Sequence, residues 1–209
     1  MPYRPLAPAS PLPKHVARLV WKLERHYLQP AHALFRLPMP HYRIVGEFQF
    51  GIAHLLLGAI AGISTTLYAQ SGSNGQRFRQ LLLDYYPFSL EPVNSVPPID
   101  AVRTLWSVFR NSLAHDLGFD VEKHAKTTET KLLRVLTKMP SGTRGLTERM
   151  IEKLEDSSTR PAQKPTVAIR PDATVLFVDV LYWGVRRMME SILADNNRVQ
   201  TAEQFLAKL

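Results

Sequence analysis

The chain has 209 residues, of which 45% are hydrophobic and 21% are charged, a composition typical of a soluble globular protein with one main domain. It contains no cysteine, which excludes a disulfide framework, a cysteine-ligated metal centre and thiol catalysis and favours a reducing, cytoplasmic location. The formal net charge of +8 favours a polyanionic partner, because electrostatic steering toward phosphate follows from net charge.

The excess positive charge is concentrated at the N-terminus. Residues 1–43 hold seven cations and a single acid, Glu24, which gives them a net charge of +6, whereas the rest of the chain is nearly balanced. Proline recurs at positions 2, 5, 8 and 11, the repeat of a polyproline II turn, and predicts an extended arm outside the core. This start lacks the pattern of a secretory signal peptide.

A short helix is predicted directly after the arm, because Val16, Val20 and Leu23 form an apolar stripe. Arg18 and Lys22, with Arg25 in the following turn, lie on another face of this helix. This basic face has two interpretations: the solvated surface of a packed helix, or a contact for a nucleic-acid backbone.

The segment 44–70 predicts a long apolar helix, closed by a Ser/Gly/Asn-rich turn. Its apolar part is long enough to cross a bilayer. Because Gln49 and His54 interrupt it and no second such segment exists, we expect a buried core helix, with no membrane partner and with His54 inside the core. Gly58 and Gly62 share one face, where another helix can approach closely.

The second half of the chain predicts further helices and one small sheet. We expect a helix over 76–85, and an amphipathic helix that Asp100 caps and Gly118 ends. Segments 131–137 and 166–170 predict a β-hairpin around an exposed helix at 146–154, and a long final helix runs from 172 to about 195. The expected domains are a basic Pro-rich N-terminal arm with its short helix (1–43) and a helical domain (44–200).

Several site chemistries have no sequence support. The chain has no phosphate-binding or dinucleotide-binding glycine loop, no GxSxG elbow and no HExxH helix. None of its seven histidines pairs with another at the four-residue spacing that places two ligands on one helix face. We therefore expect neither a metal site nor a cofactor.

One constellation remains, Arg110-Asn111-x-x-x-His115, near the end of the amphipathic helix. The bare spacing of Arg and His is weak, because Arg36 and His41 match it too; the asparagine after Arg110 makes the match far more specific. Arg110 and His115 lie about 140° apart on a regular α-helix, so their side chains converge only if the helix is irregular there or if the arginine reaches around it.

This constellation resembles the RNxxxH form of the R-x4–6-H motif of HEPN domains, which are small all-helical domains that include metal-independent ribonucleases. The order of helices over roughly 44–195 is similar to the family as well. The resemblance implies an all-α, HEPN-like helical bundle, with the small β-hairpin as an insertion after the motif helix. It also implies a homodimer in which two motifs share one cleft.

The resemblance further implies an endoribonuclease, with a toxin or defence role and an antitoxin or other regulatory protein as a partner. Arg110, Asn111 and His115 would form its catalytic site, and Glu47 is a candidate accessory residue. An imidazole can take a proton from a ribose 2′-hydroxyl near neutral pH, and a guanidinium can hold the charge that grows on the phosphate. The tyrosine that follows the histidine in many toxin-type members is absent here.

The alternative is a non-catalytic HEPN-like module that binds RNA or a protein and serves dimerisation. In that case His115 would be a histidine favoured at a helix C-terminus, Arg110 a surface cation and Asn111 a capping residue. RNA is a partner in the first interpretation and one of two partners in the second.

Overall fold

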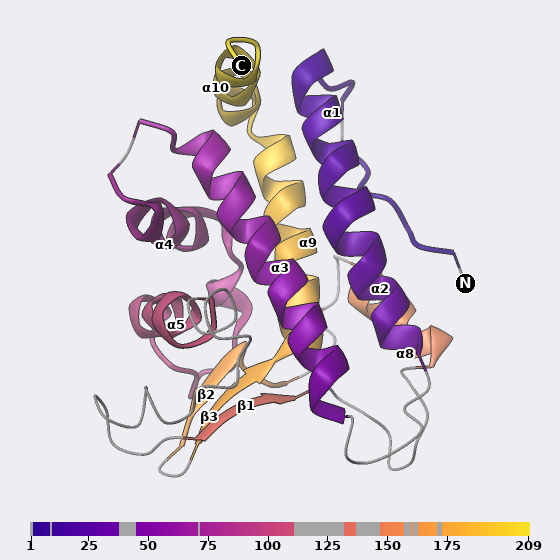
Figure 1. The fold of residues 1–209 in the computed structure, drawn as a ribbon, viewed down its shortest axis with the longest axis vertical. Helices are drawn as coiled ribbons and strands as arrows, with labels where there is room; N and C mark the ends of the chain where they lie inside the picture. The colour runs from indigo at the N-terminus through magenta and orange to yellow at the C-terminus, as the bar shows by residue number, and fades with distance from the viewer. Residues whose placement is uncertain are drawn as a thin grey trace.

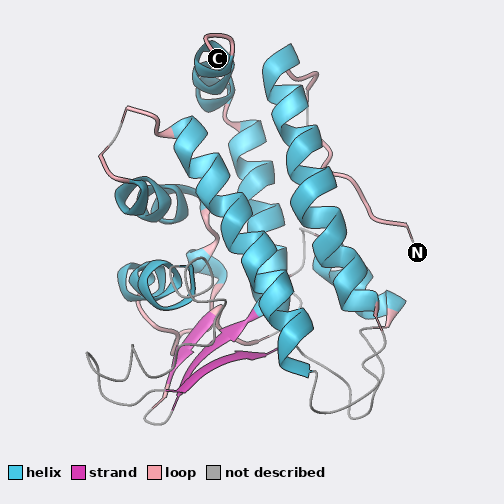
Figure 2. Ribbon diagram, viewed as in Figure 1, coloured by secondary structure: helices cyan, strands magenta, loops and turns pink. Residues whose placement is uncertain are grey.

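The structure is a computed structural model, which describes residues 2–8, 10–37, 45–70, 72–110, 132–136, 147–156, 160, 163–170 and 173–209. These residues are predominantly helical, as expected, and a small sheet lies at one end of the helices (Figure 2). The domain boundary predicted after residue 43 falls within 38–44, outside the described residues.

The N-terminal helix is longer than expected and belongs to the core. α1 (Lys14–Leu23), the π-helical segment η1 (Glu24–Leu28) and α2 (Gln29–Arg36) follow one another as a single rod beside α3 (Figure 1). Val16, Val20 and Leu23 are buried, as their spacing predicts. The start of α1 is capped from α10 (Asn196–Leu206), where the Glu203 carboxylate accepts the N–H groups of His15 and Val16, both at 3.0 Å.

Residues 2–8, here termed the N-terminal strap, were expected to stay outside the core, and this prediction is wrong. Leu6 is only 6% exposed and belongs to the main core cluster. Two carboxylates hold the strap: Glu24 accepts the N–H of Leu6 at 2.6 Å, and Glu155 accepts that of Arg4 at 3.1 Å. The proline repeat does not indicate the partners that bury this segment.

α3 (Val45–Leu67) runs through the middle of the molecule, next to α9 (Val178–Ala194) (Figure 1). By length and composition, residues Gln49–Leu67 of α3 could cross a membrane, but half of this stretch is buried inside the protein. Its inward face packs in the core, which agrees with the prediction of a core helix. His54, expected in the core, is exposed instead.

The two helices beside α3 begin slightly earlier than predicted. α4 (Asn74–Tyr85) starts with a capping box between Ser73 and Gln76, and a short 3-10 turn (Phe88–Leu90) follows it. α5 (Pro98–Thr104) starts at the proline pair, so Asp100 lies in its first turn and does not cap it. The helix then continues as the π-helical segment η3 (Leu105–Arg110).

The sheet has three strands, and the predicted hairpin is wrong. β1 (Leu132–Leu136) pairs in parallel with β3 (Ala173–Phe177), and β2 (Val167–Ile169) pairs with β3 on its other side in the antiparallel sense. β3 was expected to be the first turn of the final helix. Its central place explains the error, because a strand covered on both faces has a continuous apolar sequence that resembles a buried helix.

α8 (Glu148–Glu155) was expected to be exposed, but Ile151, Leu154 and Glu155 are buried. It packs against α9, whose residues are almost all buried. The final helix, expected to end near residue 195, ends at Ala194, and α10 follows it as a separate helix. α3 and α9 therefore supply much of the core, as predicted.

Candidate functional site

Arg110, the first residue of the predicted motif, lies in a π-helical segment. α5 is a regular α-helix as far as Thr104, and Leu105–Arg110 is π-helical. Leu105 and Phe109 are fully buried and anchor this segment in the core. π-helical turns are rare and are frequent at functional sites. Arg110 thus lies in a helix segment that departs from α-geometry, and residues 111–115, which complete the motif, lie outside the described residues.

An aromatic side chain orients Arg110. Its guanidinium carbon lies 5.0 Å from the centre of the Trp106 ring, within range for a cation–π contact. Trp106 packs on Phe78 of α4, with ring centres 5.2 Å apart. The absence of a side chain at Gly75 makes room for the indole, because a Cβ there would lie 2.9 Å from two of its atoms. α4 therefore positions Trp106, and Trp106 positions Arg110.

The other residues predicted for the catalytic site lie outside the described part of the structure. Asn111 and His115 lie outside the described residues. Glu47 lies in the first turn of α3, but its side chain is outside the described part as well. α3 itself is in contact with η3, the segment that ends in Arg110.

The three cations of the predicted basic face are all exposed. Arg18 and Lys22 lie on α1 and Arg25 lies on η1. Glu24, the one acid nearby in sequence, turns inward: its carboxylate accepts hydrogen bonds from the Leu6 N–H and the Tyr3 hydroxyl. The exposed charge of this face is consequently positive.

The structure also contains a buried polar cluster that sequence analysis missed. His32 Nδ1 lies 2.7 Å from Glu155 Oε1, and the Tyr182 hydroxyl donates to the same oxygen at 3.1 Å. Arg186, only 2% exposed, donates to the Tyr3 hydroxyl at 3.1 Å. One signal could have revealed the cluster: an arginine inside the apolar run of α9, since a buried arginine requires partners.

Electrostatics keep Glu155 ionised. Burial alone would raise the pKa of its carboxyl, but the hydrogen bond and charge of His32 and the charge of Arg186 outweigh burial and hold this pKa below its usual value. Burial raises the pKa of Tyr182 well above normal, so its hydroxyl remains a neutral donor. The cluster therefore links α2, α8, α9 and the strap through one buried carboxylate.

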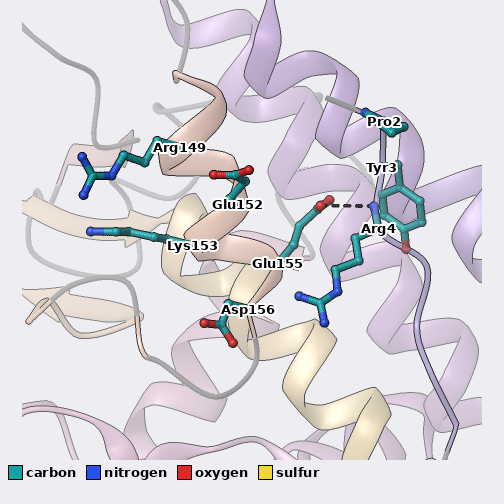
Figure 3. Close-up of a pocket in the computed structure, with 8 residues that line it drawn as sticks. All are labelled: Pro2, Tyr3, Arg4, Arg149, Glu152, Lys153, Glu155 and Asp156. Carbon is teal, nitrogen blue, oxygen red and sulfur yellow. Dashed lines mark hydrogen bonds between the residues drawn. The ribbon is translucent and has the colours of Figure 1, made fainter.

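A pocket of about 580 Å³ lies beside this cluster, between the strap and α8 (Figure 3). Glu155 points from α8 toward the strap, whereas Arg149 and Lys153 extend away from it (Figure 3). His32 and Glu155 are 5–6% exposed, and the Tyr3 ring stands edge-on to His32 with ring centres 5.7 Å apart. Because both side chains are almost fully covered and partnered within the protein, we interpret the cluster as structural.

Within the described ranges, no group of three or more His, Cys, Asp or Glu side chains is arranged to hold a metal ion. Comparison of the chain with protein-family models, curated proteins and solved structures finds no match. The observations that bear on function are therefore the Arg-Asn-x-x-x-His motif and the contact of Arg110 with Trp106.

Proposed function

We propose that the chain is a HEPN-like endoribonuclease that cleaves RNA without a metal ion and acts as a homodimer. The observation that carries the proposal is Arg110: it begins the Arg-Asn-x-x-x-His constellation, lies in a π-helical segment and stacks on Trp106. The resemblance implies a toxin or defence role with a regulatory protein partner, and the absence of cysteine favours the cytoplasm.

The Trp106 contact supports a phosphate-binding role for Arg110. A guanidinium held against an aromatic ring keeps its N–H groups available, and its orientation requires less ordering when a ligand arrives. Among the described residues, no carboxylate forms an ion pair with Arg110. Within this part of the chain, its charge is available for an anionic group.

In the proposed reaction the nucleophile belongs to the RNA. His115 accepts the proton of a ribose 2′-hydroxyl, and the 2′-oxygen bonds to the adjacent phosphorus as the bond from phosphorus to the 5′-oxygen breaks. The leaving 5′-oxygen takes up a proton, which gives a 5′-hydroxyl and a 2′,3′-cyclic phosphate. Arg110 stabilises the charge on the phosphate oxygens, and Asn111 orients the substrate or the imidazole.

The test is cleavage of a labelled single-stranded RNA by His115→Ala, Arg110→Ala and Arg110→Lys. We expect the first two to lose at least about a hundredfold in rate, because general-base and charge-stabilising groups each contribute that much. Arg103→Ala is the matched control, since Arg103 is an exposed arginine of α5. A chelator should leave the rate unchanged.

Two results would count against this proposal. If His115→Ala cleaves at the parent rate, or if a chelator stops cleavage, the mechanism is wrong. If the parent protein binds RNA and cleaves none of it, the chain is instead the non-catalytic module, an alternative that the exposed basic face of α1 and η1 favours on its own.

A further inference from the structure

The basic face of α1 and η1 carries one large aromatic side chain. Trp21 lies between Arg18 and Arg25 on this face and is 54% exposed. The Arg25 guanidinium carbon lies 5.4 Å from the centre of the Trp21 ring. His26 stands nearly perpendicular to the indole, with ring centres 6.3 Å apart. Cations and an aromatic surface thus alternate along one exposed helix face.

We propose that Trp21 is a base-stacking platform for single-stranded RNA, with the cations around it tracking the RNA backbone. The inference depends on the proposed function for its ligand, RNA, and adds the form of RNA that this face recognises. An exposed ring beside arginines is the combination with which proteins bind single strands, because every base has a π-face and unpaired bases are free to stack.

The charges around Trp21 favour a polyanion. Glu24 is held by the strap, and Glu203, from the neighbouring α10, is occupied by the His15 side chain at 2.7 Å and by two N–H groups of α1. The remaining exposed charges of this helix face are Lys14, Arg18, Lys22 and Arg25. No folding role for the exposed half of the indole is evident within the described structure.

The packing of α1 favours RNA over a membrane as the occupant. A helix that lies in a bilayer surface buries its apolar face in lipid. The apolar face of α1, which contains Val16, Val20 and Leu23, is already buried against the rest of the protein. The exposed residues of this helix are polar except for Ala17 and Trp21, which fits stacking by single bases better than insertion into lipid.

The experiment measures binding without cleavage, in the His115→Ala background, by the anisotropy of a labelled single-stranded RNA and of the matching duplex. Trp21→Ala should weaken single-strand binding about tenfold, since stacking on one aromatic ring contributes on this order. Duplex binding should stay within twofold, because paired bases cannot reach the indole. Trp21→Phe should retain most of the affinity.

Leu83→Ala is the control, since Leu83 is an exposed apolar residue on α4, 44% exposed. The inference is overturned if Trp21→Ala binds the single strand within twofold of its parent, or if single-strand and duplex affinities fall together. It is also overturned if the part of the tryptophan emission that Trp21→Phe removes shifts to the blue with phosphatidylserine vesicles but is unchanged by RNA. The binding measurement does not require cleavage, so its result can be interpreted even if the proposed catalysis fails.

Discussion

At the scale of single residues, Glu155 joins the strap to three helices. Its carboxylate contacts His32, Tyr182 and the backbone of the strap, and the buried charge of Arg186 lies close enough to lower its pKa. Removing one partner of a buried ionic cluster leaves an uncompensated charge in a low-dielectric interior, which costs more than the pair itself gains.

We therefore expect Glu155→Gln to lower the free energy of unfolding by about 3 kcal/mol at pH 7. The folded-state pKa of Glu155 is depressed, so its contribution is complete above the unfolded value of about 4.3 and disappears as the pH falls through the folded value. Urea unfolding at pH 7, 5 and 3 should show a gap between variant and parent that narrows only at the lowest pH.

The matched control is Glu152→Gln, an exposed glutamate on the same helix, which should change the free energy of unfolding by less than about 0.5 kcal/mol. A Glu155→Gln protein as stable as this control at pH 7 would show that the buried cluster has no net stabilising role.

Two glycines should respond oppositely to alanine. A Cβ on Gly184 of α9 would overlap the ring of Tyr86. The Tyr86 hydroxyl is held by a hydrogen bond of 2.7 Å with the Thr166 hydroxyl. Gly62 of α3 is exposed and has no atom within 4 Å of an added Cβ. Gly184→Ala should destabilise the fold by about 1–3 kcal/mol, and Gly62→Ala should stabilise it by about 0.5–1 kcal/mol. Thermal unfolding of both variants would test this, and equal effects would contradict the packing around Tyr86.

Sequence patterns identify a functional residue only where its partners lie close to it in the sequence. The spacing from Arg110 to His115 can be seen in the sequence, and so can the basic face of α1 and η1. The contact of His32 with Glu155 joins positions 123 residues apart, so no local pattern contains it. Glu155 therefore looked like one more surface acid of α8.

At the scale of elements, the role of the basic face of α1 and η1 can be tested by reversing its charge. Replacing Arg18, Lys22 and Arg25 together by glutamate should weaken RNA binding and make it less dependent on salt, because phosphate contacts release counterions when they form. For a single strand, three lost contacts should reduce the slope of log affinity against log salt by about 2. The motif should still cleave RNA that is present at saturation.

The measurement is a binding titration over a range of salt, with Arg103→Glu as the control for charge reversal at an exposed site on α5. Unchanged affinity of the triple variant at about 0.1 M salt would mean that this face is a solvated surface and that the excess charge serves another partner.

Helices with a clear apolar period were predictable, and elements whose partners are distant in sequence were not. Two sequence features predict α1, α3 and α4. They are the spacing of the apolar residues and the proline and glycine residues that separate the helices. β3 was mistaken for a helix because only its pairing with β1 and β2 distinguishes its apolar run from a helical one. The π-helical turns at Glu24–Leu28 and Leu105–Arg110 leave no signature in the sequence pattern.

At the scale of the whole molecule, the proposed mechanism requires two copies of the chain. Light scattering at micromolar concentration should report a mass near twice 23.7 kDa. In such a dimer, two motifs facing one cleft would double the positive charge around a backbone phosphate. A monomer that cleaves RNA at the full rate would contradict the shared cleft while leaving the roles of Arg110 and His115 intact.

The overall architecture was predictable as a class but not as an arrangement. Composition and helix period indicate a helical protein built around two apolar helices, and α3 with α9 confirms this. The burial of the strap was not predictable, because it depends on Glu24 and Glu155, carboxylates contributed by two different helices. A proline-rich start could not indicate these contacts.

The chemical ends of the RNA products test the central claim most directly. Mass spectrometry of fragments made by the parent protein in the presence of a chelator should find a 5′-hydroxyl and a 2′,3′-cyclic phosphate, because the 2′-oxygen is the nucleophile. An RNA with a 2′-O-methyl group at the scissile position should remain intact, and His115→Ala should yield no fragments. Fragments with a 5′-phosphate and a 3′-hydroxyl, or cleavage of the 2′-O-methyl RNA, would contradict the account.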